Sequence, residues 1–179
     1  PHRAVSFTVP TGNFGDIFAG YAALKMGLPI ERLVIATNDN DILARTLETG
    51  VYEMRGVVQT TSPSMDIQIS SNFERLLFEA TGRDAAAVRA MMASLNQSGS
   101  FSIENRALDE IRTLFSAGRS DVAETGGMIR AVLASDNYLA DPHTAVGLAV
   151  ARRQPQSSAP MIVLSTAHPA KFPDAVKEA

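Results

Sequence analysis

The chain has 179 residues, a net charge of −3, 45% hydrophobic residues and no cysteine. This length predicts one domain or a large part of one, with enough apolar residues for a buried core. The composition argues against nucleic-acid and membrane partners, because no basic cluster and no bilayer-length apolar run occurs, and it excludes disulfides, thiolate catalysis and cysteine metal ligands.

The chain opens with an alternating, β-rich run at residues 5–9, which predicts a strand. From Phe14 onward, apolar residues recur at helical spacing. Gly27 and Pro29 are expected to end this helix.

A second strand and helix follow directly. Residues 33–37 form a continuous apolar run, typical of a strand that is covered on both faces. Asn40 or Asp41 is expected to cap a short helix that Gly50 stops. The resulting βαβα order predicts an α/β fold with a parallel sheet flanked by helices.

The middle of the chain, residues 71–137, is expected to be mainly helical. Ser71 and Glu74 have the spacing of a capping box, which predicts a helix start. Three more helices are expected at residues 84–98, 103–118 and 125–134.

The last part returns to an α/β pattern. Asp141 precedes a proline at the first helical position, so we expect it to cap a helix. Residues 161–164 predict another buried strand, followed by the polar turn STAHPAKF. We therefore expect one domain over residues 1–179, with its α/β core at residues 1–70 and 138–179.

The turn TGNFGD, residues 11–16, lies between the first strand and the first helix. Free N–H groups at a helix start favour anions, and glycines let the backbone approach a phosphate. The motif is neither a dinucleotide-binding fingerprint nor a P-loop. Two interpretations stay open: an anion cradle, or an ordinary turn capped by Asn13 with Asp16 at the third helical position.

Four further polar stretches interrupt apolar elements: SPSMDI, SSNFER, DPHTAVG and TAHPAKF. The glycine turn and the TAHPAKF turn each follow a predicted strand. Because ligands of parallel sheets bind beyond the carboxyl ends of the strands, we expect these two turns to line one crevice.

Together, these five motifs resemble threonine synthase of the bacterial and fungal type, in order from Thr11 to Phe172. The resemblance implies the tryptophan-synthase-β-like fold of pyridoxal-phosphate (PLP) enzymes, fold type II. The fold would be incomplete here and would carry a helical insertion in the middle. It also implies a cytoplasmic biosynthetic enzyme.

By this resemblance, the turn binds the phosphate of the PLP cofactor and a hydroxyl residue faces the pyridine nitrogen. The implied cofactor-binding residues are Gly12, Asn13, Phe14, Gly15, Asp16 and Thr166, with Ser165 beside the last. A hydroxyl at this position leaves the ring nitrogen largely unprotonated, which suits elimination and replacement on the side chain. The alternative is that Thr166 only caps its own turn.

The family converts O-phosphohomoserine and water into L-threonine and phosphate. The implied substrate-binding residues are Ser62, Ser64, Ser71, Asn72, Arg75 and His143, since a leaving phosphate needs cationic and hydroxyl partners. Arg75 could equally be a surface residue, and Asn72 could serve only the helix start. For His143 both a structural hydrogen bond and general-base chemistry stay open, and for His168 an architectural or a cofactor-adjacent role.

The Schiff-base lysine of the family has no counterpart here, so no catalytic residue is assigned. Lys25, Lys171 and Lys177 are the only lysines, and none matches the family's position. The chain also starts without Met, so we expect a piece of a longer enzyme that is inactive alone and exposes apolar surface. No metal site is expected, because the three histidines lack a metal-ligand spacing.

Two alternatives remain. One is a related PLP-dependent lyase or dehydratase, which would be expected to lack SSNFER. The other is a non-catalytic module that binds a phosphate ligand and has lost its lysine.

Overall fold

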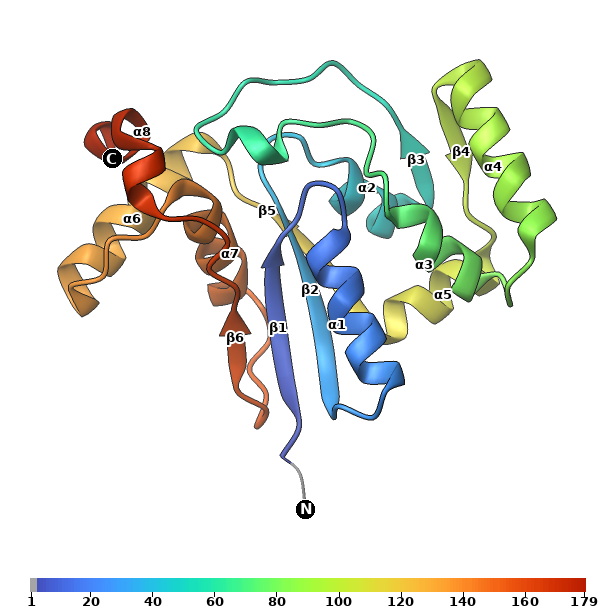
Figure 1. Cartoon of the computed structure of the whole chain (residues 1–179), viewed down its shortest axis with the longest axis horizontal. Helices are drawn as coiled ribbons and strands as arrows, with labels where there is room; N and C mark the ends of the chain where they lie inside the picture. Colours follow the sequence, from blue (N-terminus) through green and yellow to red (C-terminus); the bar gives the residue numbers. More distant parts are fainter. Residues whose placement is uncertain (1–2) are drawn as a thin grey trace.

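The computed structural model describes residues 3–179, so Pro1 and His2 lie outside it. A four-stranded sheet with the order β5-β2-β1-β6 forms its centre (Figure 1). All of its paired strands are parallel, which confirms the α/β class. The strands are β1 (Val5–Pro10), β2 (Ile30–Thr37), β5 (Phe115–Arg119) and β6 (Met161–Val163).

Strand β2 is buried on both faces, as its continuous apolar run predicts. Leu33 and Ile35 join the large core cluster on the side of α1 (Gly15–Lys25). Val34 and Ala36 point the other way and pack with Val146 of α7 (Pro142–Arg152). Figure 1 shows α1 in front of the sheet and α7 behind it. Covering both faces in this way is what a central parallel strand requires.

A helical layer lies beside the β5 edge of the sheet. It contains α2 (Ile42–Thr49), α3 (Phe73–Ala80), α4 (Ala85–Ser98) and α5 (Asn105–Leu114). A short antiparallel pair, β3 (Val51–Glu53) and β4 (Ser100–Ser102), joins this layer. The remaining elements are α6 (Val122–Asp136), α8 (Pro173–Glu178) and the 3₁₀ turns η1 (Pro63–Met65) and η2 (Pro169–Lys171).

The expected helix over residues 103–118 is wrong in its last four residues. Helix α5 ends at Leu114, and β5 then pairs with β2 from Leu33–Phe115 to Thr37–Arg119. A Cβ on Gly118 would lie 2.7 Å from Val150 Cγ1, so the small residues of β5 let helix α7 pack closely on it. In the sequence alone, the glycine and serine of this segment resemble the end of a helix, because the packing of α7 against them cannot be read from the local pattern.

The expected capping box of α3 is wrong, and the expected cap of α2 is right in position only. Neither Ser71 nor Asn72 caps α3 with its side chain, because both side chains turn toward Asn13 instead. Asp41 is the N-cap residue of α2 but makes no side-chain cap bond; its carboxylate pairs with Arg45 at 2.8 Å.

Other boundaries differ less. Helix α6 begins at Val122 rather than near residue 125, with a capping box between Asp121 and Glu124. The expected cap at Asp141 is confirmed, since its side chain accepts hydrogen bonds from the N–H groups of His143 and Thr144. Within residues 3–179, none of the helices is both long and apolar enough to span a membrane.

Candidate active site

The glycine turn is a rigid connection between β1 and α1. The N–H of Thr11 donates to the carbonyl oxygen of Ala36 at 2.8 Å, and its Oγ1 donates to that of Val9 at 2.6 Å. Phe14 has φ 65° and ψ 9°, a left-handed conformation that is uncommon outside glycine. Its ring is buried against Phe73 at a centroid distance of 5.2 Å, which fixes this conformation.

The carbonyl groups of the glycine turn accept hydrogen bonds from residues 70–72. Ser70 Oγ donates to the carbonyl oxygen of Gly12 at 2.7 Å. The backbone N–H and Nδ2 of Asn72 donate to that of Asn13 at 3.1 and 2.8 Å. Asn13 therefore does not cap α1, and residues 70–72 hold the turn in place.

Tyr52 fixes the position of Ser70. Its hydroxyl oxygen accepts a hydrogen bond from the N–H of Ser70 at 2.8 Å, and its ring stacks between Phe73 and Phe101. Burial raises the pKa of Tyr52, and the Ser70 N–H only partly offsets this effect. The phenol thus stays a neutral acceptor, which links the glycine turn to the helical layer.

The backbone N–H groups from Gly12 to Ile17 donate no hydrogen bond within the described residues. They lie at the N-terminal end of α1, where the helix dipole is positive. The left-handed residue within the turn belongs to the type of backbone that forms anion-binding concavities. The turn is therefore built to accept an anion with several acceptor oxygens.

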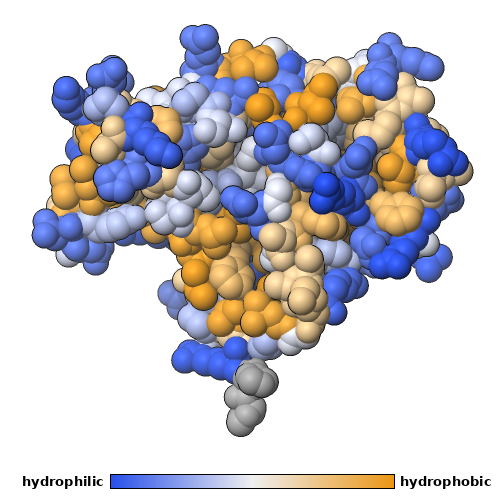
Figure 2. Space-filling model, viewed as in Figure 1, coloured by the Kyte–Doolittle hydropathy of each residue, from blue (hydrophilic) through white to orange (hydrophobic). Residues whose placement is uncertain are grey.

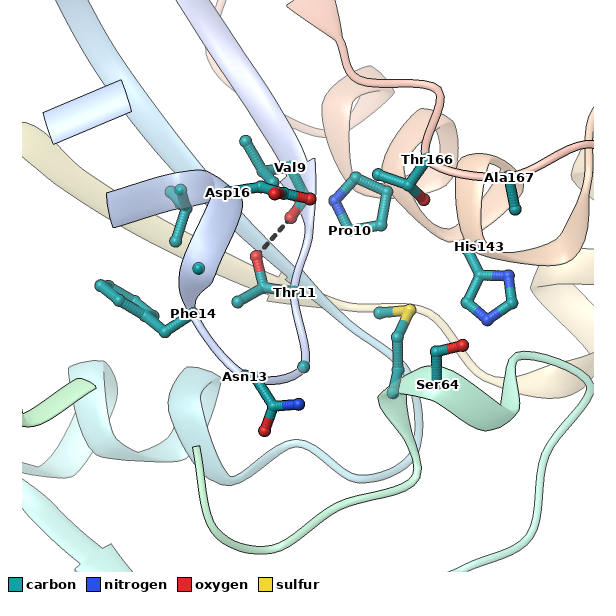
Figure 3. Close-up of a pocket in the computed structure, with 14 residues that line it drawn as sticks. Val9, Pro10, Thr11, Asn13, Phe14, Asp16, Ser64, His143, Thr166 and Ala167 are labelled. Carbon is teal, nitrogen blue, oxygen red and sulfur yellow. Dashed lines mark hydrogen bonds between the residues drawn. The ribbon is translucent and has the colours of Figure 1, made fainter. Parts of the chain in front are cut away.

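These N–H groups border a cavity of about 300 Å³ (Figure 3). Its other walls come from separate parts of the chain, namely Ser64 and Met65 of η1, His143 of α7, and Thr166 with Ala167 after β6. The glycine turn and the turn after β6 thus border one space, as their positions after two strands predict.

A buried polar network fixes the loop that carries Ser64. Asn38 Nδ2 lies 2.7 Å from Asp66 Oδ1 and 3.0 Å from Ser62 Oγ. Asp66 also accepts from Asn40 Nδ2 at 3.0 Å and from the N–H of Thr60 at 2.8 Å. Because every partner is satisfied, this network determines the path of residues 58–66 and thus the position of Ser64 at the cavity.

His143 is held by a buried carboxylate. Asp141 Oδ1 lies 2.9 Å from His143 Nδ1, and Oδ2 accepts from the Thr144 hydroxyl. Burial alone would raise the pKa of Asp141, but the hydrogen bonds from His143 and Thr144 outweigh it and lower the pKa. His143 Nε2 is buried without a hydrogen-bond partner in the described residues.

The structure brings most of the sequence-predicted site residues to the cavity. Those that line it are Gly12, Asn13, Phe14, Gly15, Asp16, Ser64, His143 and Thr166. Ser71 and Asn72 lie outside it, against the glycine turn. Arg75 of α3 has its guanidinium 6.0 Å from the Phe18 ring centre. Ser62 is 1% exposed within the Asn38 network and does not reach the cavity.

The two remaining candidates from the last turn, Ser165 and His168, contact other protein groups. Ser165 Oγ lies 3.3 Å from the Tyr138 hydroxyl and 3.4 Å from that of Thr144. His168 is exposed, and its Nδ1 accepts from the N–H of Ala170 at 3.2 Å.

Sequence reasoning missed three supports of the site, Asn38, Asp66 and Tyr52. A signal existed for Asn38, because the polar run TNDND follows the buried strand β2 at the same sheet edge as the glycine turn. For Asp66 and Tyr52 no such signal exists, since their partners Asn38 and Ser70 are distant in sequence.

Comparison with known proteins extends this picture. Residues 144–179 match the family model "Threonine synthase, C-terminal". Threonine synthase of Pseudomonas aeruginosa is 49% identical over all of this chain. The crystal structure of PLP-bound threonine synthase from Brucella melitensis is 72% identical over 99% of it, with a TM-score of 0.98. Yeast threonine synthase is 42% identical over 98%, with a TM-score of 0.89.

The sheet and its glycine turn thus have the architecture of PLP-dependent enzymes of fold type II. Within this class the chain belongs to the threonine synthase family. It spans 38% of the length of each of these three relatives.

Proposed function

We propose that the full-length protein containing this chain is a threonine synthase that converts O-phosphohomoserine and water into L-threonine and phosphate with PLP. The observation that carries the proposal is the row of free N–H groups from Gly12 to Gly15, in one cavity with Thr166. The relative with 72% identity is described as PLP-bound, which supports this assignment.

The residues of the cavity fit the cofactor. A Cβ on Gly12 would lie 2.7 Å from the carbonyl oxygen of Ser64, so the turn and η1 approach as closely as backbone allows. The free amides at the start of α1 would hold the phosphate ester, with Asp16 adjoining. When bound, PLP supplies an electron-withdrawing ring that stabilises charge on the substrate.

Thr166 is proposed to face the pyridine nitrogen of this ring. It lines the cavity on the side opposite Asn13, after β6 (Figure 3). A hydroxyl does not hold a proton on the nitrogen as a carboxylate would, so the ring remains a moderate electron acceptor. This property suits elimination and replacement at the side chain of an amino acid.

The substrate phosphate needs a second set of donors. Ser64 is exposed at the cavity, and Ser71 and Asn72 lie next to the glycine turn, while the guanidinium of Arg75 lies near Phe18, further along α1. We assign the substrate phosphate to this side of the turn, because hydroxyl, amide and guanidinium groups suit it. Ser62 acts indirectly, since the Asn38 network already binds its hydroxyl.

Within the described residues 3–179, no lysine lines the cavity. Lys25 is the last residue of α1, one helix length of about 15 Å from the glycine turn. Lys171 and Lys177 lie in η2 and α8, outside the cavity wall. The amine that carries the cofactor is therefore expected from the part of the protein that this chain does not contain.

An assay on two proteins tests the proposal. The full-length protein with PLP should release phosphate from O-phosphohomoserine and form an equal amount of threonine, whereas the 179-residue chain should form neither. Formation of 2-oxobutanoate and ammonia in place of threonine, beside the released phosphate, would instead indicate a related lyase. Turnover by the isolated chain would contradict the assignment of the missing amine.

We further infer that residues 1–179 form part of one PLP-binding α/β domain. The support is that β5, which lies within the mainly helical segment 71–137, pairs in register with β2. The α/β core therefore includes residues 115–119 in addition to the expected ranges 1–70 and 138–179. We place the enzyme in the cytoplasm, because the proposed reaction belongs to amino-acid biosynthesis.

A further inference from the structure

His143 presents an unsatisfied nitrogen at the proposed cofactor site. The residue is 3% exposed, and its Nε2 has no hydrogen-bond partner among residues 3–179. A buried polar atom without a partner costs about 1–3 kcal/mol, so such atoms in a native fold call for an occupant or a role.

Asp141 determines which ring nitrogen carries the proton. Its Oδ1 lies 2.9 Å from Nδ1 of His143 and accepts as well from the N–H of His143, also at 2.9 Å. An ionised carboxylate can only accept hydrogen bonds, so Nδ1 must donate. In the neutral ring Nε2 is then an acceptor with a free lone pair.

The ring cannot turn away from this arrangement. Phe172 packs against one side of the imidazole with ring centres 4.7 Å apart. Asp141 itself is 0% exposed and is fixed by the hydroxyl of Thr144 as well. Figure 3 shows the imidazole next to Ser64, at the edge of the cavity that the glycine turn borders.

The two sides of this cavity have opposite hydrogen-bonding roles toward a ligand. The N–H groups from Gly12 to Gly15 can only donate, so they bind acceptor oxygens. An unprotonated Nε2 can only accept, so a fully deprotonated anion would leave it unsatisfied. One proton placed between Nε2 and an anion oxygen satisfies both sides.

We propose that a phosphate ester bound at the glycine turn shares one proton with Nε2 of His143, and that Asp141 is the positioning residue for this proton. The inference rests on the proposed function and extends it to a proton that phosphate binding takes up from solvent. The second ionisation of a free phosphate ester has a pKa of about 6. At pH 8 the free ligand is therefore a dianion that does not bring the proton itself, so the proton is taken up from solvent on binding.

Other ionisable groups surround the same space. Asp16 lines the cavity from α1, and Asp141 lies on the helix of His143 itself. His168 and Lys171 belong to η2, which leads to Phe172. Because a single substitution at position 143 leaves all four in place, their contributions cancel when variant and wild type are compared.

The test uses the full-length protein and pyridoxine 5'-phosphate, which carries the phosphate ester but has no aldehyde to react with a lysine. Calorimetric titration at pH 8 in two buffers of different ionisation enthalpy gives the number of protons taken up on binding. We expect wild type to take up about one proton more than His143→Gln, whose amide can donate without being protonated. The control is His168→Gln, an exposed histidine, which should take up as many protons as wild type.

Two results separate the inference from the proposed function. Equal uptake by wild type and His143→Gln, with both binding the probe, overturns the shared proton but leaves the phosphate site intact. Failure of wild type to bind the probe at all overturns both.

A second measurement covers a variant that does not fold. In wild type with ¹⁵N-labelled histidine, the Nε2 resonance of His143 should move toward the protonated position when the probe binds at pH 8. An unchanged resonance on saturation overturns the inference. With Asp141→Asn the same resonance should shift less, whereas a purely structural role of Asp141 predicts an equal shift.

Discussion

Gly12 is the residue at which the site tolerates the least change. Its missing side chain lets the carbonyl oxygen of Ser64 approach to 2.7 Å from the position of a Cβ, and backbone on both sides prevents adjustment. We predict that Gly12→Ala weakens PLP binding by the full-length protein about tenfold or more, because overpacking costs roughly 1–3 kcal/mol. Titration of cofactor absorbance measures this loss.

Gly127→Ala is the matched control. In α6 the nearest atom to a Cβ at this position is Arg130 Nη2 at 3.9 Å, so the methyl group fits. The variant should bind PLP as wild type does and gain up to about 1 kcal/mol of stability from helix propensity. Equal losses of PLP affinity in both variants would show that PLP binding does not depend on the close backbone approach at Gly12.

Asp141 predicts a pH-dependent stability. Its pKa is lower in the folded protein than the unfolded value of about 3.9, because bonds from His143 and Thr144 outweigh burial. A lowered folded pKa stabilises above the unfolded pKa, and the contribution is lost as the pH falls through the folded value. Asp141→Asn should therefore cost about 2–3 kcal/mol at pH 7 and less at pH 3.

Denaturant unfolding at both pH values measures this difference, with the exposed Asp136→Asn as control. A cost for Asp141→Asn that is the same at pH 7 and pH 3 would be inconsistent with an ionised carboxylate at this position.

At the residue scale, the sequence was informative where side chains follow strands. The glycine turn and Thr166 could be placed at one cavity because parallel strands end at one sheet edge. The environment of Ser62 and the unpartnered Nε2 of His143 could not be predicted, because each depends on which groups other loops place nearby.

At the scale of elements, the loop of residues 54–70 depends on Asp66. This carboxylate accepts hydrogen bonds from Asn38, Asn40 and Thr60, all between 2.7 and 3.0 Å. We predict that Asp66→Ala frees the loop while the sheet stays folded, because the loop has few apolar contacts of its own. Faster hydrogen exchange confined to residues 54–70 is the expected observation.

Asp174→Ala serves as control for Asp66→Ala, since Asp174 lies in α8 on the exposed surface. Unchanged exchange in the loop of Asp66→Ala would mean that other contacts determine its path.

The elements that the sequence predicted wrongly share a cause. Strand β5 and the pair β3–β4 are short, and each is defined by pairing with a distant partner. The helices and strands predicted correctly, such as β1 and α7, carry their own periodicity or cap. Local patterns contain no information on which neighbour will complete a five-residue strand.

At the scale of the whole molecule, apolar residues gather on the exposed face over β1, β6 and α1 (Figure 2). Ile162 of β6 is 42% exposed and Leu28, after α1, is 43% exposed. β6 is also an edge strand of the sheet. An apolar sheet edge of this kind is prone to pair with another chain.

We therefore predict that the isolated 179-residue chain self-associates and that Ile162→Lys reduces this association. Leu133→Lys, on α6 away from this face, is the control because Leu133 is 44% exposed. Sedimentation velocity over a concentration series measures both. Equal association of the two variants would argue against β6 as the contact.

The central claim is that the free N–H groups of the glycine turn hold the phosphate ester of PLP. A crystal structure of the full-length protein with PLP tests it most directly. We predict phosphate oxygens within hydrogen-bond distance, about 2.7–3.2 Å, of the backbone nitrogens between Gly12 and Gly15. A well-ordered PLP whose phosphate lies elsewhere, with these nitrogens bound to water alone, would contradict the account.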